Sequence, residues 1–189
     1  ALTARAILFV SWAGLMANYP KTVFMTDAAS SATPLSQLQG GASGVSLVDL
    51  LIGNCGGVLG ETCKIAIILG GIYLIIRGIV DWRIPVFFIG TAFICYLISD
   101  SFDMALAQIL SGGLMLGAFF MATDYVTCPM TSLGRIIMGI GCGILLFVIR
   151  KYANYIEGCS FAILFMNVMT PMIDRFTAGK TFGEVKSHG

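Results

Sequence analysis

Two long stretches without a charged side chain, residues 65–76 and 85–99, constrain the fold more than any other feature of this sequence. Across the 189 residues, 57% are hydrophobic and 11% are charged, whereas a soluble domain carries about 25% charged residues. We therefore predict an all-α integral membrane protein, because helices satisfy their own backbone hydrogen bonds in lipid. A net charge of +1 without a basic stripe argues against a nucleic-acid partner.

The apolar runs divide the chain into four parts. We assign residues 1–17 to the end of a transmembrane helix of a longer polypeptide and residues 18–64 to an extracytoplasmic segment with a re-entrant half-helix. Residues 65–174 form a predicted five-helix transmembrane domain, and residues 175–189 form a cytoplasmic tail. The five predicted helices span residues 65–79, 85–98, 104–122, 135–149 and 159–173.

Two polar breaks interrupt the apolar runs. The run at residues 45–52 is too short to cross a bilayer, which needs about 20 residues, and glycines and an asparagine follow it. Residues 121–135, "MATDYVTCPMTSLGR", bring an acid, hydroxyls and a proline into a second apolar run. Irregular backbone at membrane depth is tolerated only where protein buries it or where it lines a wet cavity. Two such breaks in one chain are typical of transporters, and their similar acid, threonine and cysteine patterns favour an internal repeat.

An acid and a threonine lie beside each break: Glu61, Thr62, Asp124 and Thr127. Ionisable groups in membrane segments are costly and usually functional. One interpretation is structural, in which the acids cap half-helix ends or pair with Lys64 and Arg135. The alternative is an ion path, in which these side chains and the carbonyls freed by the breaks supply oxygens to a cation.

The six cysteines form no CxxC pair, and the only histidine is His188 in the tail. Most of the cysteines lie in apolar or glycine-rich runs, where small packing residues are expected. The sequence therefore predicts no metal site built by this chain alone.

Residues 27–38, "DAASSATPLSQL", form a hydroxyl-rich stretch in an otherwise apolar chain. Thr33 followed by Pro34 is a good helix start, with the threonine as N-cap and the proline at the first helical position, where its missing N–H costs nothing. From the residue pattern alone, capping is the favoured interpretation of Thr33.

Lysines and arginines indicate an orientation. Arg77 and Arg83 bracket one turn, and Arg175 begins a basic tail four crossings later, so both fit the cytoplasmic side. Residues 18–64 then face outward, whereas Arg150 and Lys151 contradict this arrangement. The turn "RGIVDWRIP" is either a set of ordinary interface anchors or a docking site for a neighbouring subunit.

Three segments, in order, resemble one family. "SSATPL" resembles the flavin-attachment motif [ST]-G-A-T of the B subunit of the sodium-pumping NADH:quinone reductase and of the D subunit of the Rnf complex. "LIGNCGGVLGETC" with "GGIYLIIRGIVDWRIP" resembles the membrane block of those subunits, and "FMATDYVTCPMT" resembles their second broken helix. The likeness runs over residues 27–135, with Ser31 where the motif commonly has glycine, and the tail favours the Rnf branch.

The resemblance implies a fold related to urea and ammonium channels, with two inverted halves of five helices, of which this chain holds the second and the end of the first. It implies FMN bound covalently through its phosphate to the Thr33 hydroxyl by an extracytoplasmic flavin transferase. The small neighbours Ser30, Ser31 and Ala32 then leave room for the flavin, and Asp27 either aids recognition by the transferase or begins the turn. Under this resemblance the acids and threonines at the breaks shape the flavin pocket or line the ion path, and a second, non-covalent riboflavin is an added option.

We therefore expect a subunit of an Rnf-type ion-translocating ferredoxin:NAD⁺ oxidoreductase in the bacterial cytoplasmic (inner) membrane, with its flavin on the extracytoplasmic side. Its expected partners are the other subunits of the complex, membrane lipid and Na⁺ or H⁺, and the chain alone is not a complete enzyme. The rival hypothesis is a non-redox channel or solute carrier with the same fold. A purely structural scaffold is the third.

Overall fold

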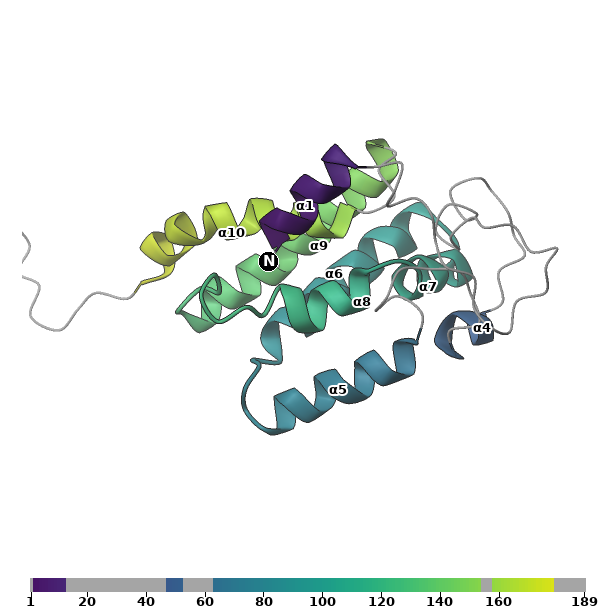
Figure 1. Cartoon of the computed structure of the whole chain (residues 1–189), viewed down its shortest axis with the longest axis horizontal. Helices are drawn as coiled ribbons and strands as arrows, with labels where there is room; N and C mark the ends of the chain where they lie inside the picture. Colours follow the sequence, from purple (N-terminus) through teal and green to yellow (C-terminus); the bar gives the residue numbers. More distant parts are fainter. Residues whose placement is uncertain (1, 13–46, 53–62, 154–157, 179–189) are drawn as a thin grey trace, which may run out of the picture.

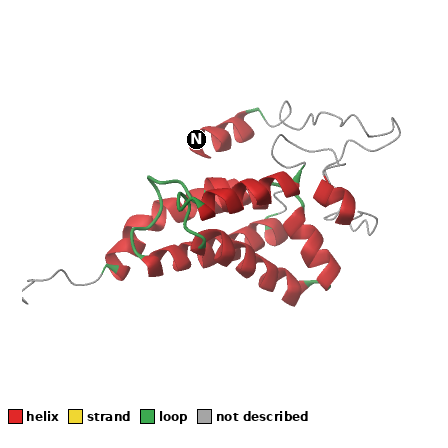
Figure 2. Cartoon of the chain, turned by 90° about the horizontal axis from the view of Figure 1, so that it is seen from below, coloured by secondary structure: helices red, strands yellow, loops and turns green. Residues whose placement is uncertain are grey.

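The computed structural model describes residues 2–12, 47–52, 63–153 and 158–178, and within these ranges it is helical and contains no strand, as predicted (Figures 1 and 2). The helical elements are α1 (Leu2–Ser11), α4 (Leu47–Ile52), α5 (Lys64–Ile76), α6 (Arg83–Ser99), α7 (Phe102–Leu110), α8 (Leu114–Leu116), the π-helical η1 (Gly117–Met121), α9 (Ser132–Tyr152) and α10 (Gly158–Thr177). Four of the five predicted membrane helices correspond to α5, α6, α9 and α10 within a few residues at each end.

The helices from α5 onward run back and forth between two ends of a bundle. At one end, the Arg83 side chain lies 3.3 Å from the Ser132 hydroxyl, so α6 and α9 begin side by side. At the other end, Lys151 lies 4.0 Å from Asp100, so the same two helices also finish side by side and are parallel. We call these ends the Asp81 end and the Lys64 end, after a residue in the α5–α6 turn and the first residue of α5.

Glycines bring α9 close to α6. A Cβ atom on Gly143 would lie 2.7 Å from Thr91 Cβ and 3.0 Å from Phe88 O, and one on Gly139 would lie 3.1 Å from Ile84 O. The two glycines are four residues apart and therefore share one face of α9. Small residues at this spacing let helix backbones approach closely in membranes, and buried Phe88 and Ala92 pack in the resulting core.

The third pass is broken, whereas the sequence predicts one continuous helix over residues 104–122. α7 ends at Leu110, the chain bends by 64° before the segment formed by α8 and η1, and Gly112 has a φ of 67°. A positive φ of this size favours glycine. The prediction is wrong here because glycine is common within membrane helices and therefore does not by itself indicate a break.

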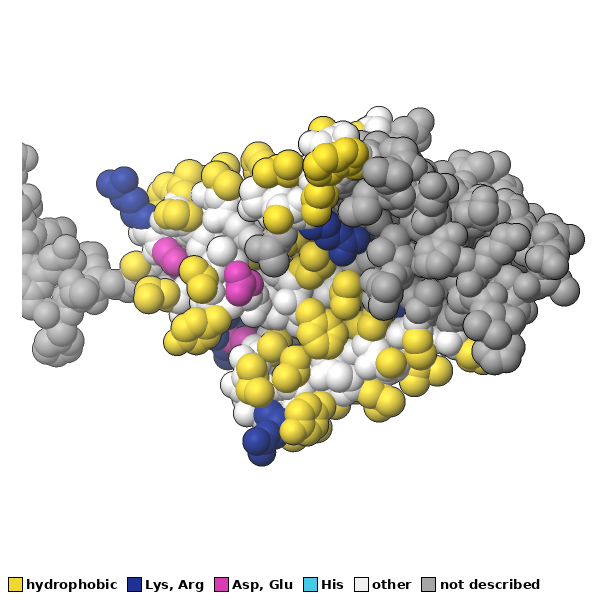
Figure 3. Space-filling view, in the orientation of Figure 1, with side chains coloured by type: hydrophobic (Ala, Val, Ile, Leu, Met, Phe, Trp, Pro, Cys, Tyr) yellow, Lys and Arg dark blue, Asp and Glu magenta, His cyan; other side chains and the backbone are white. Residues whose placement is uncertain are grey.

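Apolar side chains cover much of the described surface (Figure 3). Ile76, Ile98 and Val168 are each more than 70% exposed. Among the described helices, α9 is long and apolar enough to cross a membrane. The bent segment from α7 to η1 also qualifies if it is counted as one span. α5 and α6 are shorter apolar helices. An exposed apolar surface of this extent is suited to lipid or to neighbouring membrane helices.

Candidate functional site

Asp81 binds two arginines at the end of the bundle that is named after it. Its Oδ2 accepts hydrogen bonds from Arg135 Nη1 at 2.5 Å and from Arg83 Nη1 at 3.1 Å, and its Oδ1 accepts one from the Arg83 backbone N–H at 3.1 Å. Burial raises the pKa of this carboxyl, but the hydrogen bonds and charges of Arg135 and Arg83 outweigh burial and hold the pKa below its ordinary value of 3.8. Arg135 also donates from Nε to Pro129 O at 3.0 Å. One guanidinium thus joins the α5–α6 turn to the loop before α9.

That loop, residues 122–131, is held against α10 by hydrogen bonds. The Met130 N–H donates to Asp174 Oδ1 at 3.0 Å, and the Thr170 hydroxyl lies 3.0 Å from Thr127 O. Both partners on α10, Asp174 and Thr170, lie near its C-terminal end. The polar break predicted at residues 121–135 is therefore an ordered loop that uses α10 as its support.

Two of the predicted site residues, Asp124 and Thr127, come together in this loop. Asp124 is exposed, Thr127 is half-buried, and the Thr127 hydroxyl lies 3.5 Å from Asp124 Oδ2. The interpretation that Asp124 pairs with Arg135 is wrong, because Asp81 accepts the hydrogen bond from that guanidinium. Asp124 instead lines a cavity.

The other predicted site residues lie outside the part of the chain that the structure describes. They are Asp27, Ser30, Ser31, Ala32, Thr33, Glu61 and Thr62. Their roles in flavin attachment, in a flavin pocket or in an ion path stay predictions, as does the pairing of Glu61 with Lys64.

Two cavities adjoin the loop. The larger, of about 1070 Å³, lies between the α5–α6 turn, the loop and α10, and its lining includes Asp81, Arg135 and Asp174. The smaller, of about 540 Å³, lies between α1, η1 and α10, and its lining includes Asp124. Thr127 and Asn167 line both cavities. The two cavities therefore adjoin at Thr127 of the loop and Asn167 of α10.

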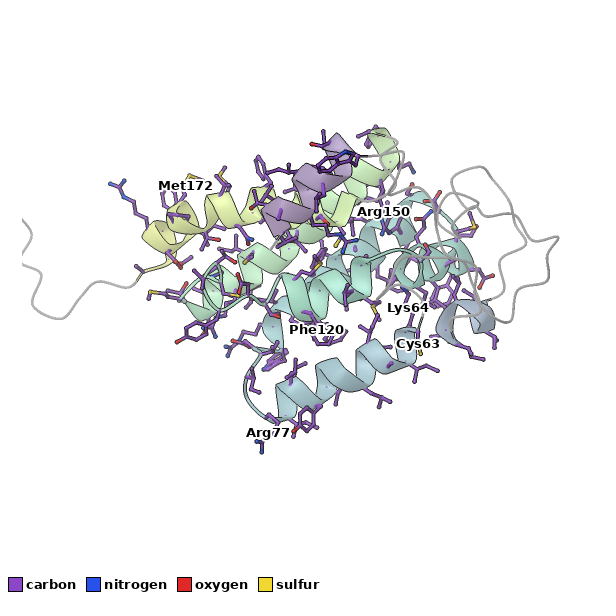
Figure 4. The ribbon with its side chains drawn as sticks, viewed as in Figure 1. Cys63, Lys64, Arg77, Phe120, Arg150 and Met172 are labelled. Atoms are coloured by element: carbon purple, nitrogen blue, oxygen red, sulfur yellow. The ribbon has the colours of Figure 1, made fainter. Side chains whose placement is uncertain are left out.

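At the Lys64 end, two buried cations bind the carbonyls of the broken third pass (Figure 4). Lys64, 1% exposed, donates from Nζ to Gly112 O at 2.8 Å. Arg150, 4% exposed, donates from Nη1 to Gln108 O at 2.8 Å and from Nη2 to Ser111 O at 3.5 Å. The last carbonyls of a helix have no partner within the helix. Here side chains from α5 and α9 supply the missing donors.

Cys142 and Cys159 lie in the hydrophobic core, which agrees with the packing role predicted for them. Among the described residues, no three His, Cys, Asp or Glu side chains gather in a way that could hold a metal ion.

The structure adds functional candidates that the sequence pattern does not indicate. From the sequence, Lys64 is interpreted as the partner of an acidic side chain and Arg150 as a charge in a loop. Asn167 is, from the sequence, a single polar residue in an apolar helix. Two signals point to them in retrospect: a Ser-Gly-Gly sequence at residues 111–113 within an apolar run, and an asparagine four residues before Pro171 in an apolar helix.

Known proteins that are similar to this chain over most of its length include the D subunits of three complexes. The chain is 45% identical to the D subunit of the Na⁺-translocating ferredoxin:NAD⁺ oxidoreductase complex of Acetobacterium woodii, over 98% of this chain and 59% of the relative. It is 40% identical to the D subunit of the proton-translocating ferredoxin:NAD⁺ oxidoreductase complex of Clostridium ljungdahlii, over 95% of this chain and 59% of the relative. It is 38% identical to the D subunit of the ion-translocating oxidoreductase complex of Stutzerimonas stutzeri, over 84% of this chain and 49% of the relative.

The chain thus spans about half to three fifths of the length of these relatives. A sequence model of one family, described as NQR2, RnfD, RnfE, matches residues 1–183. This match includes the loop with Asp124 and Thr127, the break with its two cations, and the hydroxyl-rich stretch around Thr33. As the three resembling segments predicted, the chain belongs to the NQR2, RnfD, RnfE family.

Proposed function

We propose that this chain is the D subunit of an Rnf-type ion-translocating ferredoxin:NAD⁺ oxidoreductase in the bacterial cytoplasmic membrane. The observation that carries the proposal is the family match over residues 1–183, together with relatives that are named as the D subunits of such complexes. The apolar surface and the broken helix are in keeping with a membrane protein. The other subunits of the complex are its partners, and they supply the ferredoxin and NAD⁺ sites.

The cofactor that we propose is FMN, esterified through its phosphate to the Thr33 hydroxyl by a flavin transferase. A phosphate ester requires an alcohol oxygen, and the neighbours Ser31 and Ala32 are small enough to leave space for a bulky group. A flavin supplies one- and two-electron chemistry that protein side chains lack. The role of the chain is to tether and orient that group on the extracytoplasmic side.

The ion path that we propose passes the loop at residues 122–131. Asp124 supplies a carboxylate and Thr127 a hydroxyl within 3.5 Å of it, and both line the smaller cavity. Oxygen atoms at broken membrane helices are the usual ligands of coupling ions. The fold that accommodates them is one half of an inverted repeat related to urea and ammonium channels.

The positions of the basic residues support an orientation with the Asp81 end in the cytoplasm. Arg77 is exposed at this end, and Arg83 and Arg135 also lie there. Arg150 at the opposite end is buried against carbonyls, so it does not count as a loop charge. Lys151 lies 4.0 Å from Asp100. Of the two residues that contradicted the orientation, Arg150 therefore loses its weight, whereas the exposed Lys151 keeps it.

Intact mass spectrometry of the chain purified with its complex from the native host tests the flavin assignment. We expect the wild-type chain to exceed its sequence mass by about 438 Da, the mass of FMN less water, and to fluoresce under ultraviolet light in a denaturing gel. Thr33→Val should remove both signals because valine has no hydroxyl, whereas the control Ser36→Ala should keep them. A dark wild-type band at the unmodified mass would refute the assignment and favour the non-redox channel or carrier.

A further inference from the structure

Asn167 lies on α10 at the point where the two cavities adjoin. It lines the larger cavity together with Thr170 and Asp174, and the smaller one together with Leu164 and Val168. Thr127, in the loop that rests on α10, also lines both. Thr127 and Asn167 therefore mark the place where the two cavities adjoin.

Two oxygen atoms of Asn167 lack the partners that such atoms normally have. Its side-chain Oδ1 is buried and has no hydrogen-bond partner among the described residues. Its backbone carbonyl would accept a hydrogen bond from residue 171 in a regular helix, but that residue is Pro171, which has no N–H. A buried acceptor without a donor is costly, and such groups in native proteins usually serve an ion, a water or a catalytic role.

The charges around the two cavities favour a cation. Their described lining contains three carboxylates, those of Asp81, Asp124 and Asp174, and one guanidinium, that of Arg135. Arg135 is already hydrogen-bonded to Asp81. Cavities with an excess of one sign of charge concentrate ions of the opposite sign.

We infer that Asn167 is a ligand for Na⁺ at the junction of the two cavities, with its amide oxygen and its proline-freed carbonyl as neutral donors. Thr127 contributes oxygen from the facing loop, and Asp124 supplies the negative charge beside it. Amide and carbonyl oxygens bind a metal cation but do not take up a proton at neutral pH, so this site selects Na⁺ over H⁺. This inference rests on the proposed function, because ion transport by the complex is what gives the site a role. It adds to that function which ion is bound and which residue binds it.

The test measures radioactive Na⁺ binding to the purified, intact complex and Na⁺ uptake into sealed vesicles driven by reduced ferredoxin and NAD⁺. Asn167→Leu keeps a similar volume and removes the amide oxygen, and we expect the Na⁺ concentration for half-maximal binding and uptake to rise about tenfold or more. Asn167→Asp keeps an oxygen at the same place and should retain Na⁺ binding. Met172→Leu, on the same helix but in neither cavity lining, is the control and should match wild type.

Wild-type Na⁺ affinity in Asn167→Leu would overturn the inference. So would an equal loss of Na⁺ binding in Asn167→Leu and Asn167→Asp while both complexes are assembled. A third contrary result is that the wild-type complex, driven by reduced ferredoxin and NAD⁺, takes up no Na⁺ into the vesicles. Flavin content and subunit composition of each variant report assembly. Because equilibrium Na⁺ binding needs no flavin and no electron transfer, it separates this inference from the proposed function. A complex that lacks flavin but binds Na⁺ through Asn167 would refute only the redox role.

Discussion

Replacement of Gly143 by alanine tests how closely α6 and α9 must approach. The new Cβ atom would lie 2.7 Å from Thr91 Cβ and 3.0 Å from both Phe88 O and Ala92 N. Two of these three neighbours are backbone atoms of α6, so the clash is relieved only if the helices move apart. Overpacking of this kind costs about 1–3 kcal/mol.

Gly90→Ala on α6 is a matched control, because its Cβ atom would meet nothing within 4 Å. Alanine stabilises a helix by about 0.5–1 kcal/mol relative to glycine, and both variants gain this amount. Their difference therefore isolates the cost of the clash, about 1–3 kcal/mol. For a chain of this size, 1 kcal/mol corresponds to about 2–4 °C in melting temperature, so Gly143→Ala should melt about 2–12 °C below Gly90→Ala.

The assay is thermal unfolding of the purified complex in detergent, followed by size-exclusion chromatography of what stays soluble. Equal melting temperatures for Gly143→Ala and Gly90→Ala would show that α6 and α9 are not held by this glycine contact. The packing described for the centre of the bundle would then be wrong.

Two further perturbations act at the two ends of the bundle. At the Asp81 end, the lowered pKa of Asp81 means that its carboxylate stabilises the fold above pH 3.8, and that this stabilisation is lost as the pH falls through the pKa in the folded protein. Asp81→Asn should reduce stability at pH 7 by about 1–2 kcal/mol. An unchanged melting temperature at pH 7 would contradict this. At the Lys64 end, Arg150→Met removes the guanidinium donor from the carbonyls of Gln108 and Ser111, of which Gln108 O keeps only the Ser111 hydroxyl at 3.4 Å. It should destabilise by about 1–3 kcal/mol, whereas the adjacent Lys151→Met, at a side chain 39% exposed, should change stability by about 0–1 kcal/mol. Equal effects in thermal unfolding would argue against the buried role of Arg150.

Much of the fold could be predicted because membrane helices leave a simple pattern. The apolar runs at residues 65–79 and 135–149 correspond to α5 and α9, since a segment without charges in this class of protein has few alternatives to a helix. The ends were less predictable: α9 begins at Ser132, three residues early, because the Thr131 hydroxyl caps it through the Gly134 N–H at 3.0 Å. Such a cap depends on geometry that a hydropathy pattern does not contain.

The candidate site was predictable only in part, because its decisive contacts join distant parts of the chain. The sequence indicated Asp124 and Thr127 through their place in a polar break. It could not indicate that Arg135 would pair with Asp81, 54 residues away, in preference to Asp124, 11 residues away. Asn167 gains its significance only once the loop is placed across from it.

The carbonyls freed by the break in the third pass are the kind of ligand that transporters offer to a passing ion, yet here they hold Lys64 and Arg150. A side chain anchored in a neighbouring helix cannot diffuse away, so a free ion could enter only by displacing a charge that is covalently attached to the protein. The break in the third pass is therefore held in place by two cations that belong to the protein itself. The loop at residues 122–131 differs in this respect, because what it contacts on α10 is uncharged Thr170 and the carboxylate of Asp174 rather than a buried cation.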